Sequence, residues 1–501
     1  MTATTASPDV WSTPLTPLAF LGRSAEVFPD REAVVYGERR MTYTQLSAEV
    51  TRVAHALRAC GVTPGDRVAY LMPNIPEMLV ANFAVPLAGG VLVAINTRLA
   101  PPEVKYILEH SGATVLVVDA ALHNLVDSGL GDLPELRHVV TVTDPAGGVQ
   151  PSPTVPGFSY DQLLAMGNDE SLPWTVEDER STISINYTSG TTGRPKGVMY
   201  HHRGAFLNSL SEIIHSQHTG RTRYLWTLPM FHCNGWCTAW AITAIGGTHV
   251  CLRAVDADVI WDLFDKEGVT HLNGSPTVLV SIASSSRVHT LDREIVVTVA
   301  GAPPSPTVIS TMTGIGAKLV HVYGLTETYG PYTVCEVQVG WDALDIRERS
   351  RLMARQGVGM IVTDGIRVVD DYAHNGEKIR AAITAAQSGC DRLIAIFQPH
   401  GYGPARFLRP ELREILPTVL RAQDRFCYAE IFYSGGTVAK DISSRDLAAD
   451  LPPGLRCGYA ANHQQVLAWA AEEAHAGDTV LLMGARDPDL PKLAHALFGL
   501  M

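Results

Sequence analysis

The order of apolar and polar positions along the first two thirds of the chain predicts alternating strands and helices. Apolar residues recur three or four positions apart in residues 43–60, which predicts a helix. Short runs rich in β-branched residues, each suited to one buried strand, lie between such stretches at 68–72, 115–118, 182–186, 225–228, 295–300 and 319–323. This alternation is typical of parallel sheets flanked by helices. Residues 144–173 are weakly patterned and rich in Pro, Gly and Ser, so we expect a surface excursion there.

The last third of the chain carries a second and more compact series. The candidate strands, each followed by a helical stretch, are residues 367–369, 392–397, 426–432, 455–459 and 479–483. Their spacing predicts a Rossmann-like, doubly wound α/β domain. We therefore expect a multidomain α/β protein of layered sheets, divided into subdomains at 1–180 and 181–340, a charged linker at 341–362 and the Rossmann-like domain at 363–501.

Composition narrows the classes of function. The chain has 501 residues, of which 46% are hydrophobic and 18% charged, as expected for a folded enzyme. A formal net charge of -12 offers no basic face for nucleic acid. The apolar runs are too short to span a membrane, and residues 1–11 show no secretory signal, which predicts a cytoplasmic protein. Its eight scattered Cys are expected to be free thiols. A homo-oligomer is compatible with the sequence.

The sharpest local signal is the stretch from Tyr187 to Gly197, directly after a predicted strand. Three glycines let backbone N–H groups converge on an anion, four hydroxyl side chains add donors, and Lys196 adds a positive charge. This combination suits a triphosphate, so ATP is the expected ligand. The stretch is not a Walker loop, because no Lys-Ser or Lys-Thr pair follows the second glycine. The predicted phosphate-binding residues are Thr188, Ser189, Gly190, Thr191, Thr192, Gly193 and Lys196.

Four stretches in this order resemble the adenylate-forming superfamily of acyl-CoA synthetases, luciferases and peptide-synthetase adenylation domains. They are residues 187–197, 229–236, 300–304 and 323–328, within a resemblance that covers about residues 1–358. The resemblance implies that His232 gates or orients the substrate carboxylate. It also implies a nucleotide site in which Thr326 contacts phosphate, Glu327 holds Mg²⁺, and the adenine lies against Gly301, Ala302, Pro303, Tyr323 and Gly324.

The activity implied by this resemblance is ATP-dependent activation of a carboxylic acid. The carboxylate attacks the α-phosphate of ATP to give an acyl-adenylate and pyrophosphate, and CoA then displaces AMP. The residues expected to act in catalysis are Lys196, His232, Thr326 and Glu327. The sequence around the motifs, at residues 327–331 and 354–358, is most similar to that of synthetases that act on short- to medium-chain or aromatic acids.

The chain departs from this family after residue 358. The small barrel with its ribose-binding aspartate, the hinge and the C-terminal domain with its catalytic lysine have no counterpart here. Beyond residue 318 the only lysines are Lys378, Lys440 and Lys492, and none has a matching context. Loss of a lysine aimed at developing charge costs a factor of about 10² to 10³ in rate, by analogy with an oxyanion-hole donor. We therefore expect impaired turnover.

Residues 363–501 instead resemble the C-terminal domain of muramyl (Mur) ligases, which join an amino acid to a carboxylate. The resemblance rests on 368–375, 397–402, 441–444 and 478–485, and it implies that Asp371, His374 and Asn375 approach the adenine and ribose of a nucleotide. Gly376, Gly401 and Gly403 depart from the residues usual in that family. The Gly-Lys-Thr phosphate loop that Mur ligases need is absent from the chain.

The chain is thus interpreted as a fusion, and three functions stay open. The first is an acyl-CoA synthetase-like ligase that uses ATP, Mg²⁺ and CoA. The second is a Mur-type ligase that forms an amide and releases inorganic phosphate. The third is a nucleotide-binding protein without turnover. Nucleotide product analysis, AMP against ADP, separates the three.

Overall fold

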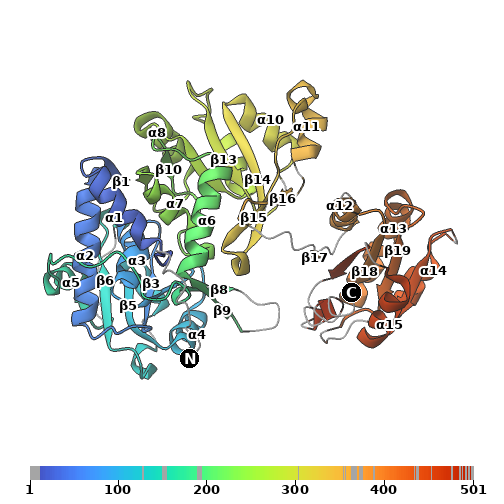
Figure 1. Ribbon diagram of the computed structural model, residues 1–501, viewed down its shortest axis with the longest axis horizontal. Helices are drawn as coiled ribbons and strands as arrows, with labels where there is room; N and C mark the ends of the chain where they lie inside the picture. Colours follow the sequence, from blue (N-terminus) through green and yellow to red (C-terminus); the bar gives the residue numbers. More distant parts are fainter. Residues whose placement is uncertain are drawn as a thin grey trace, which may run out of the picture. The chain divides into compact units, whose positions relative to one another are not determined.

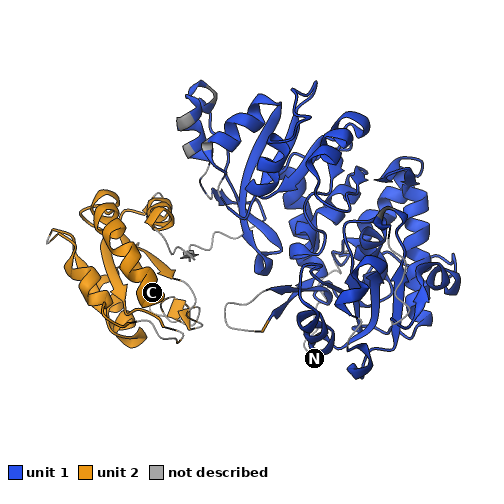
Figure 2. Cartoon of the chain, turned by 180° about the vertical axis from the view of Figure 1, so that it is seen from behind, with its two compact units in different colours: residues 1–189, 195–363 blue, residues 190–194, 364–501 orange. Residues whose placement is uncertain are grey.

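The computed structural model divides the protein into two compact units, drawn in blue and orange in Figure 2. Residues 1–189 with 195–363 form unit 1, and residues 364–501 belong to unit 2. The structure describes residues 12–126, 129–148, 155–188, 194–302, 304–353, 355, 357–362, 369–371, 376–387, 390–433, 435, 439–452, 454–475, 478–484, 487, 489–490, 493–494 and 497.

Unit 1 contains a seven-stranded sheet and a nine-stranded sheet. The order in the first is β7 (Phe158–Ser159), β6 (His138–Val142), β5 (Ala113–Asp119), β3 (Arg67–Leu71), β4 (Val91–Ala94), β8 (Thr182–Thr188) and β9 (Lys196–His201). The order in the second is β16 (Val358–Gly359), β15 (Gly330–Val334), β14 (Ala317–Leu325), β13 (Ile295–Val299), β12 (His271–Gly274), β10 (Arg223–Leu225), β11 (Thr248–Val250), β1 (Glu32–Tyr36) and β2 (Arg39–Thr42). Neighbouring strands are parallel except at the sheet edges, where β2, β9, β15 and β16 are antiparallel to their neighbours.

The helices of unit 1 alternate with these strands along the chain (Figure 1). They are α1 (Leu18–Val27), α2 (Tyr43–Ala59), α3 (Pro76–Leu87), α4 (Pro101–Ser111), α5 (Tyr160–Met166), α6 (His202–His215), α7 (Thr238–Ala244), α8 (Ala257–Glu267), α9 (Pro276–Ala283), α10 (Pro306–Gly314) and α11 (Ile346–Met353). Short 3-10 turns are η1 (Ala120–Leu125), η2 (Leu130–Asp132), η3 (Pro145–Gly147), η4 (His232–Cys237), η5 (Thr326–Thr328) and η6 (Trp341–Ala343).

The two sheets of unit 1 share a large apolar core, and a buried ionic cluster also joins them. Apolar side chains of α8, α9 and α10 cover one face of the nine-stranded sheet. Arg253, which follows β11, pairs with Asp119 at 2.7 Å and with Asp144 at 2.5 Å, both beside strands of the other sheet. Tyr36 of β1 donates a 2.5 Å hydrogen bond to Asp144. The two sheets are therefore fixed to one another by groups that are nearly out of contact with water.

Unit 2 is a doubly wound α/β domain. Its five parallel strands are ordered β17 (Val369–Asp371), β21 (Thr479–Gly484), β18 (Leu393–Gln398), β19 (Arg425–Ala429) and β20 (Cys457–Ala460). Its helices are α12 (Gly376–Gln387), α13 (Tyr402–Val419), α14 (Ser444–Ala449) and α15 (His463–Glu473). Side chains of α12 and α13 cover one face of the sheet, and those of α15 cover the other.

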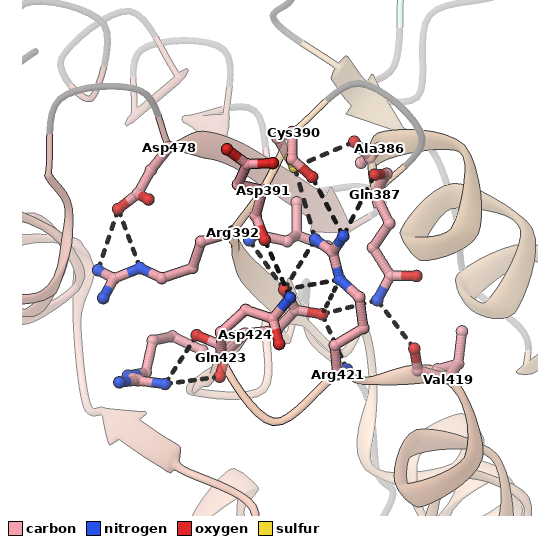
Figure 3. A network of polar contacts seen from close by, with 12 residues as sticks. Ala386, Gln387, Cys390, Asp391, Arg392, Val419, Arg421, Gln423, Asp424 and Asp478 are labelled. Atoms are coloured by element: carbon pink, nitrogen blue, oxygen red, sulfur yellow. Dashed lines mark hydrogen bonds and ion pairs between the residues drawn. The ribbon is translucent and has the colours of Figure 1, made fainter.

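A polar network closes the amino end of this sheet (Figure 3). The fully buried carboxylate of Asp424 accepts hydrogen bonds from the backbone of Leu393 at 2.9 Å, from the Gln387 amide at 2.7 Å and from the Arg421 guanidinium at 3.0 Å. Arg421 also donates to the Cys390 carbonyl at 3.1 Å. This network holds β18, α12 and the turn before β19 together.

The layered α/β fold and the Rossmann-like domain are confirmed, and two local predictions are wrong. The run at 225–228 is strand only up to Leu225, because the carbonyls of Trp226 and Leu228 bind the Asn74 amide instead of a neighbouring strand. The segment 144–173 is more than an excursion, since it contains β7 and α5. The hydroxyl of Ser159 and the side chain of Gln162 cap α5 reciprocally.

Candidate active site

The β8–β9 hairpin carries the predicted phosphate loop. The two strands are antiparallel, and Thr188 at the end of β8 is paired with Lys196 at the start of β9. Thr188 is half-buried and Lys196 is exposed. The predicted residues Ser189, Gly190, Thr191, Thr192 and Gly193 lie between them, outside the described residues. The strand expected to precede the loop is confirmed.

Helix α4 holds the base of this hairpin, beside which it lies in Figure 1. The Tyr106 hydroxyl donates to the Pro195 carbonyl at 3.3 Å, and the Tyr187 hydroxyl lies 2.8 Å from Nδ1 of His110. Burial raises the pKa of Tyr187 to about 12, so its hydroxyl keeps its proton. These contacts fix the positions from which Thr188 and Lys196 leave the sheet.

The second group of predicted residues lies where β13 and β14 end. These strands are parallel and in register, with Val299 opposite His321, so their carboxyl ends meet at one edge of the sheet. Gly301 and Ala302 follow β13 and are exposed, and Pro303 lies outside the described residues. Tyr323 and Gly324 end β14, with Tyr323 half-buried. The carboxyl edge of a parallel sheet is where ligands of such folds bind.

A tight turn follows β14 and presents Thr326 and Glu327. The Thr328 hydroxyl accepts from Leu325 N at 2.9 Å and lies 2.8 Å from the Gly330 carbonyl, which closes the turn. A Cβ at Gly324 would stand 1.8 Å from that carbonyl, so only glycine fits there. Glu327 is exposed at the tip of the turn. A single carboxylate suits Mg²⁺, which keeps several waters and binds substrate phosphates.

Tyr200 of β9 connects the hairpin to this turn. Its hydroxyl donates a 2.7 Å hydrogen bond to the Thr326 carbonyl, and its ring stacks on Tyr329 with 4.1 Å between centroids. The Tyr329 hydroxyl in turn accepts from the backbone of His201 at 3.0 Å. Lys196 and Thr326 therefore belong to one braced assembly across the two sheets. Tyr200 and Tyr329 are not among the predicted site residues. The only sequence signals for them are the alternation of strand β9 for Tyr200 and the position directly after the motif for Tyr329.

His232 opens a left-handed turn, η4. Cys233, Asn234, Gly235 and Trp236 have φ of 46°, 41°, 58° and 57°, and Cys237 has 62°. Left-handed geometry costs about 1 to 2 kcal/mol per non-glycine residue, so neighbouring groups must hold it. The Asn234 amide donates to Asn82 Oδ1 at 2.6 Å, and the Asn208 amide donates to the Trp236 and Tyr329 carbonyls at 3.4 and 3.1 Å.

The left-handed turn places His232 beside the Thr326 turn. The Cys233 sulfur lies 3.1 Å from the Thr326 hydroxyl and 3.8 Å from Nε2 of His232. His232 is classed as exposed. Desolvation of its imidazole and the positive charge of Arg98 nevertheless lower the pKa of this group. Burial raises the pKa of the Cys233 thiol to about 11. Both groups are therefore neutral at pH 7, and His232 can accept or donate a hydrogen bond without carrying charge.

Unit 2 offers a cavity of about 540 Å³ at the carboxyl ends of β18, β19 and β20. Gln398, Glu430, Tyr433 and His463 are among its lining residues. The buried Oδ atoms of Asp487 lie beside it, with Oδ2 3.2 Å from Nε2 of His463. Asp371 ends β17, while His374 and Asn375 lie outside the described residues, so their predicted contact with a nucleotide stays a prediction.

Comparison with known proteins assigns the larger part of the chain. A family profile described as AMP-binding enzyme matches residues 21–378. The chain belongs to this family. A second profile, the glutamate ligase domain of Mur ligases, matches residues 357–486, which confirms the predicted fusion of the AMP-binding region with a Mur-type domain.

The AMP-binding region resembles curated CoA ligases. It is 41% identical over 381 residues to 4-hydroxybutyrate--CoA ligase 2 of Metallosphaera sedula, covering 74% of this chain and 67% of the relative. It is 39% identical over 373 residues to the peroxisomal acetate/butyrate--CoA ligase AAE7 of Arabidopsis thaliana, covering 72% and 65%. The chain thus spans about two thirds of the length of these relatives.

Solved structures agree with this assignment. The N-terminal domain of FACL13 from Mycobacterium tuberculosis is 28% identical with a TM-score of 0.57, covering 69% of this chain and 83% of that one. The anthranilate CoA ligase AuaEII, solved with anthranoyl-AMP, shares the fold at 22% identity and a TM-score of 0.61, covering 70% of this chain and 65% of that one. Among the described residues, no helix is both long and apolar enough to cross a membrane. Within the same residues, no group of three or more His, Cys, Asp or Glu is placed to hold a metal ion.

Proposed function

We propose that unit 1 activates a small carboxylic acid with ATP and Mg²⁺, forming an acyl-adenylate and pyrophosphate, and transfers the acyl group to CoA. The observation that carries the proposal is the Tyr200–Thr326 hydrogen bond of 2.7 Å, because it joins the hairpin with the predicted phosphate loop to the turn with Thr326 and Glu327. A phosphate site and a metal-binding carboxylate in one braced assembly are what nucleotidyl transfer requires.

In this proposal each predicted residue has one role. Thr188, Lys196 and the loop between them bind the phosphates of ATP. Glu327 binds Mg²⁺, and Thr326 contacts a phosphate oxygen. The neutral imidazole of His232 orients the substrate carboxylate beside them. The adenine ring is placed against Gly301, Ala302, Pro303, Tyr323 and Gly324.

We further propose that the acid is short. The curated relatives carry the names of ligases for 4-hydroxybutyrate, acetate and butyrate. The AMP-binding family profile matches residues 21–378, which include the whole candidate site. Cys233 and Trp236 follow His232 in the chain and are buried against Val320 and Val322 of β14. A short apolar layer of this kind matches a chain of a few carbons, with or without a polar end.

Turnover is proposed to be slow. Along the sequence, unit 2 follows the AMP-binding region where the lysine-bearing domain is expected, and its lysines have no matching context. Lys440 lies 5.0 Å from the centroid of the Tyr433 ring of unit 2. In unit 1, Lys196 and Glu327 are the groups proposed to stabilise the phosphate charge that develops in adenylate formation.

Pyrophosphate exchange tests the proposal. The full chain is incubated with ATP, Mg²⁺, labelled pyrophosphate and one acid from a panel running from acetate to octanoate, with benzoate and 4-hydroxybutyrate included. We expect label to appear in ATP only when a suitable acid is present. The variant that carries both Lys196→Ala and Glu327→Gln should lose this exchange. Glu348→Gln, an exposed carboxylate in α11, is the matched control and should exchange normally. Absence of exchange with every acid, in a protein that also fails to bind ATP, would refute the proposal.

A second function is supported by the cavity of unit 2. Its position at the carboxyl edge of a parallel sheet suits a small substrate, and the domain matches the Mur ligase profile. A Mur-type reaction would form an amide through an acyl phosphate, with Asp371, His374 and Asn375 near the nucleotide. ADP and inorganic phosphate that appear only when an amino acid is added, without AMP, would select this function.

A further inference from the structure

One face of the nine-stranded sheet carries buried polar side chains among apolar ones below the candidate site. Ala300 and Val322 lie at the carboxyl edge of this face and pack in one cluster with Cys233 and Trp236. Two residues deeper along β13 lies Thr298, which is in register with Asn273 of β12 on the same face. The apolar row of Ala300 and Val322 at the edge is therefore followed by a polar row of Thr298 and Asn273. Val320 of the apolar cluster lies beside Thr298, and Val296 lies below it.

The polar row continues into α6. The hydroxyls of Thr298 and Ser216 are 3.0 Å apart, and the Ser216 hydroxyl donates to Glu212 Oε2 at 3.4 Å. The Asn273 amide donates to the Thr238 hydroxyl at 3.3 Å, in the helix that follows the left-handed turn. Glu212 and Ser216 are 0% exposed, and Asn273 and Thr298 are 1% exposed. The row therefore lies out of contact with bulk water, directly behind the turn that begins at His232.

Several atoms of this region have no partner within the described part of the chain. They are Asn273 Oδ1, Glu212 Oε1, Ser211 Oγ and both ring nitrogens of His218. A buried polar atom left without a hydrogen bond costs about 1 to 3 kcal/mol. Native proteins therefore pair such atoms with another polar group, a water or a ligand. Burial raises the pKa of Glu212 to about 8, so at neutral pH its carboxyl group is a hydrogen-bond donor. The row thus offers one donor, from Glu212, and one acceptor, Asn273 Oδ1.

The depth of the row matches a short acid. Two residues along a parallel strand span about 6.6 Å, which separates the edge of the sheet from the polar row. A four-carbon chain bridges a similar length when its carboxylate lies at the edge beside Thr326 and His232. Its methylene groups then contact the apolar row, and a substituent on its last carbon reaches Asn273 and Glu212.

We propose that Glu212, Ser216, Asn273 and Thr298 form a recognition site for the distal hydroxyl group of a short hydroxy acid. The hydroxyl donates to Asn273 Oδ1 and accepts from the Glu212 carboxyl group. The inference rests on the proposed activation of a carboxylic acid by unit 1, because that function places the carboxylate at the edge of the sheet.

Two non-hydrolysable acyl-adenylate analogues test the inference without requiring turnover. The full chain is titrated by calorimetry with the acyl-sulfamoyl adenosines of 4-hydroxybutyrate and of butyrate. We expect the hydroxylated analogue to bind about tenfold more tightly, the value of one satisfied buried hydrogen bond. Equal affinity for both analogues would overturn this inference and leave the proposed function standing. Binding of neither would overturn the proposed function itself.

Variants assign the preference to the polar row. Asn273→Leu should remove the preference for the hydroxylated analogue while butyrate affinity is kept or improved. Thr298→Val, which is isosteric, should reduce the preference and serves if Asn273→Leu does not fold. Tyr70→Phe is the control, because it removes another buried hydroxyl without a partner, in β3 of the other sheet, and it should keep the preference. A preference retained in both polar-row variants would contradict the assignment.

Discussion

The Tyr200 hydroxyl donates a 2.7 Å hydrogen bond to the Thr326 carbonyl, and this bond joins the seven-stranded sheet to the candidate nucleotide turn of the nine-stranded sheet. Tyr200 lies four residues after Lys196 on the same strand, and Thr326 precedes Glu327. Together with the stacking of Tyr200 on Tyr329, this bond helps to set the distance between the predicted phosphate and metal ligands, although the tyrosine has no catalytic chemistry of its own.

Tyr200→Phe should lower pyrophosphate exchange about 5- to 30-fold, since loss of this bond costs about 1 to 2 kcal/mol and leaves the Thr326 carbonyl with only the 3.1 Å hydrogen bond from Tyr329 N. Stacking on Tyr329 is kept, so the protein should stay folded. Exchange rates and thermal unfolding are measured together.

Tyr43→Phe provides the comparison for that variant. The Tyr43 hydroxyl also donates a 2.7 Å bond to a backbone carbonyl, that of Gly247, and is equally buried but lies away from the site. It should lose similar stability and keep its exchange rate. Equal exchange in the two variants would show that the Tyr200 bond is only structural.

The sequence predicted the strands around the site better than the site's own geometry. Runs of β-branched residues located β8, β13 and β14 because the central residues of these strands are largely buried, β13 throughout its length. The run at 225–228 misled because Trp226 and Leu228 are apolar for another reason: they are buried beneath the site, with their carbonyls bound by Asn74.

The left-handed turn could not have been predicted. Of its five positive-φ residues only Gly235 is a glycine, and Cys233, Asn234, Trp236 and Cys237 favour other conformations. Their geometry depends on Asn82 and Asn208, which are distant in sequence. Pairing of Thr326 with Cys233 is equally a product of tertiary structure, so the motifs gave the residue types and the fold gave their arrangement.

His232 should keep activity into mildly acidic solution. Because desolvation and Arg98 lower its pKa, the imidazole stays neutral below the ordinary value of about 6.5. The rate of pyrophosphate exchange, corrected for the concentration of Mg·ATP at each pH, should therefore be constant between about pH 7.5 and 6.5 and fall only at lower pH. Arg98→Gln removes a positive charge, so the fall should move to higher pH. A midpoint that stays fixed in Arg98→Gln would exclude His232 as the group that titrates.

Glu212 should make the protein less stable as pH rises. Its pKa is about 8 in the folded protein and near 4.3 when unfolded, so between these values the unfolded chain releases a proton that the folded chain keeps. The contribution is fully present below the unfolded pKa, declines with rising pH and levels off above pH 8. Glu212→Gln has no proton to release, so it should gain stability relative to the wild type across this window, by on the order of a few kcal/mol at pH 8. Urea unfolding at several pH values measures the difference, and parallel curves would contradict the assignment.

Asp424 should control the stability of unit 2 without affecting the site in unit 1. Burial alone would raise its pKa, but the Arg421 guanidinium and backbone N–H donors outweigh burial and hold the pKa below its usual value. The stability from this carboxylate is therefore present above about pH 4 and is lost as pH falls through the lowered pKa. Asp424→Asn leaves Arg421 without its counter-charge and should cost about 2 to 3 kcal/mol, because that guanidinium stays partly exposed. Calorimetry should show an earlier unfolding transition for unit 2, with ATP affinity and pyrophosphate exchange unchanged. A single transition that shifts as a whole would instead show that the two units unfold together.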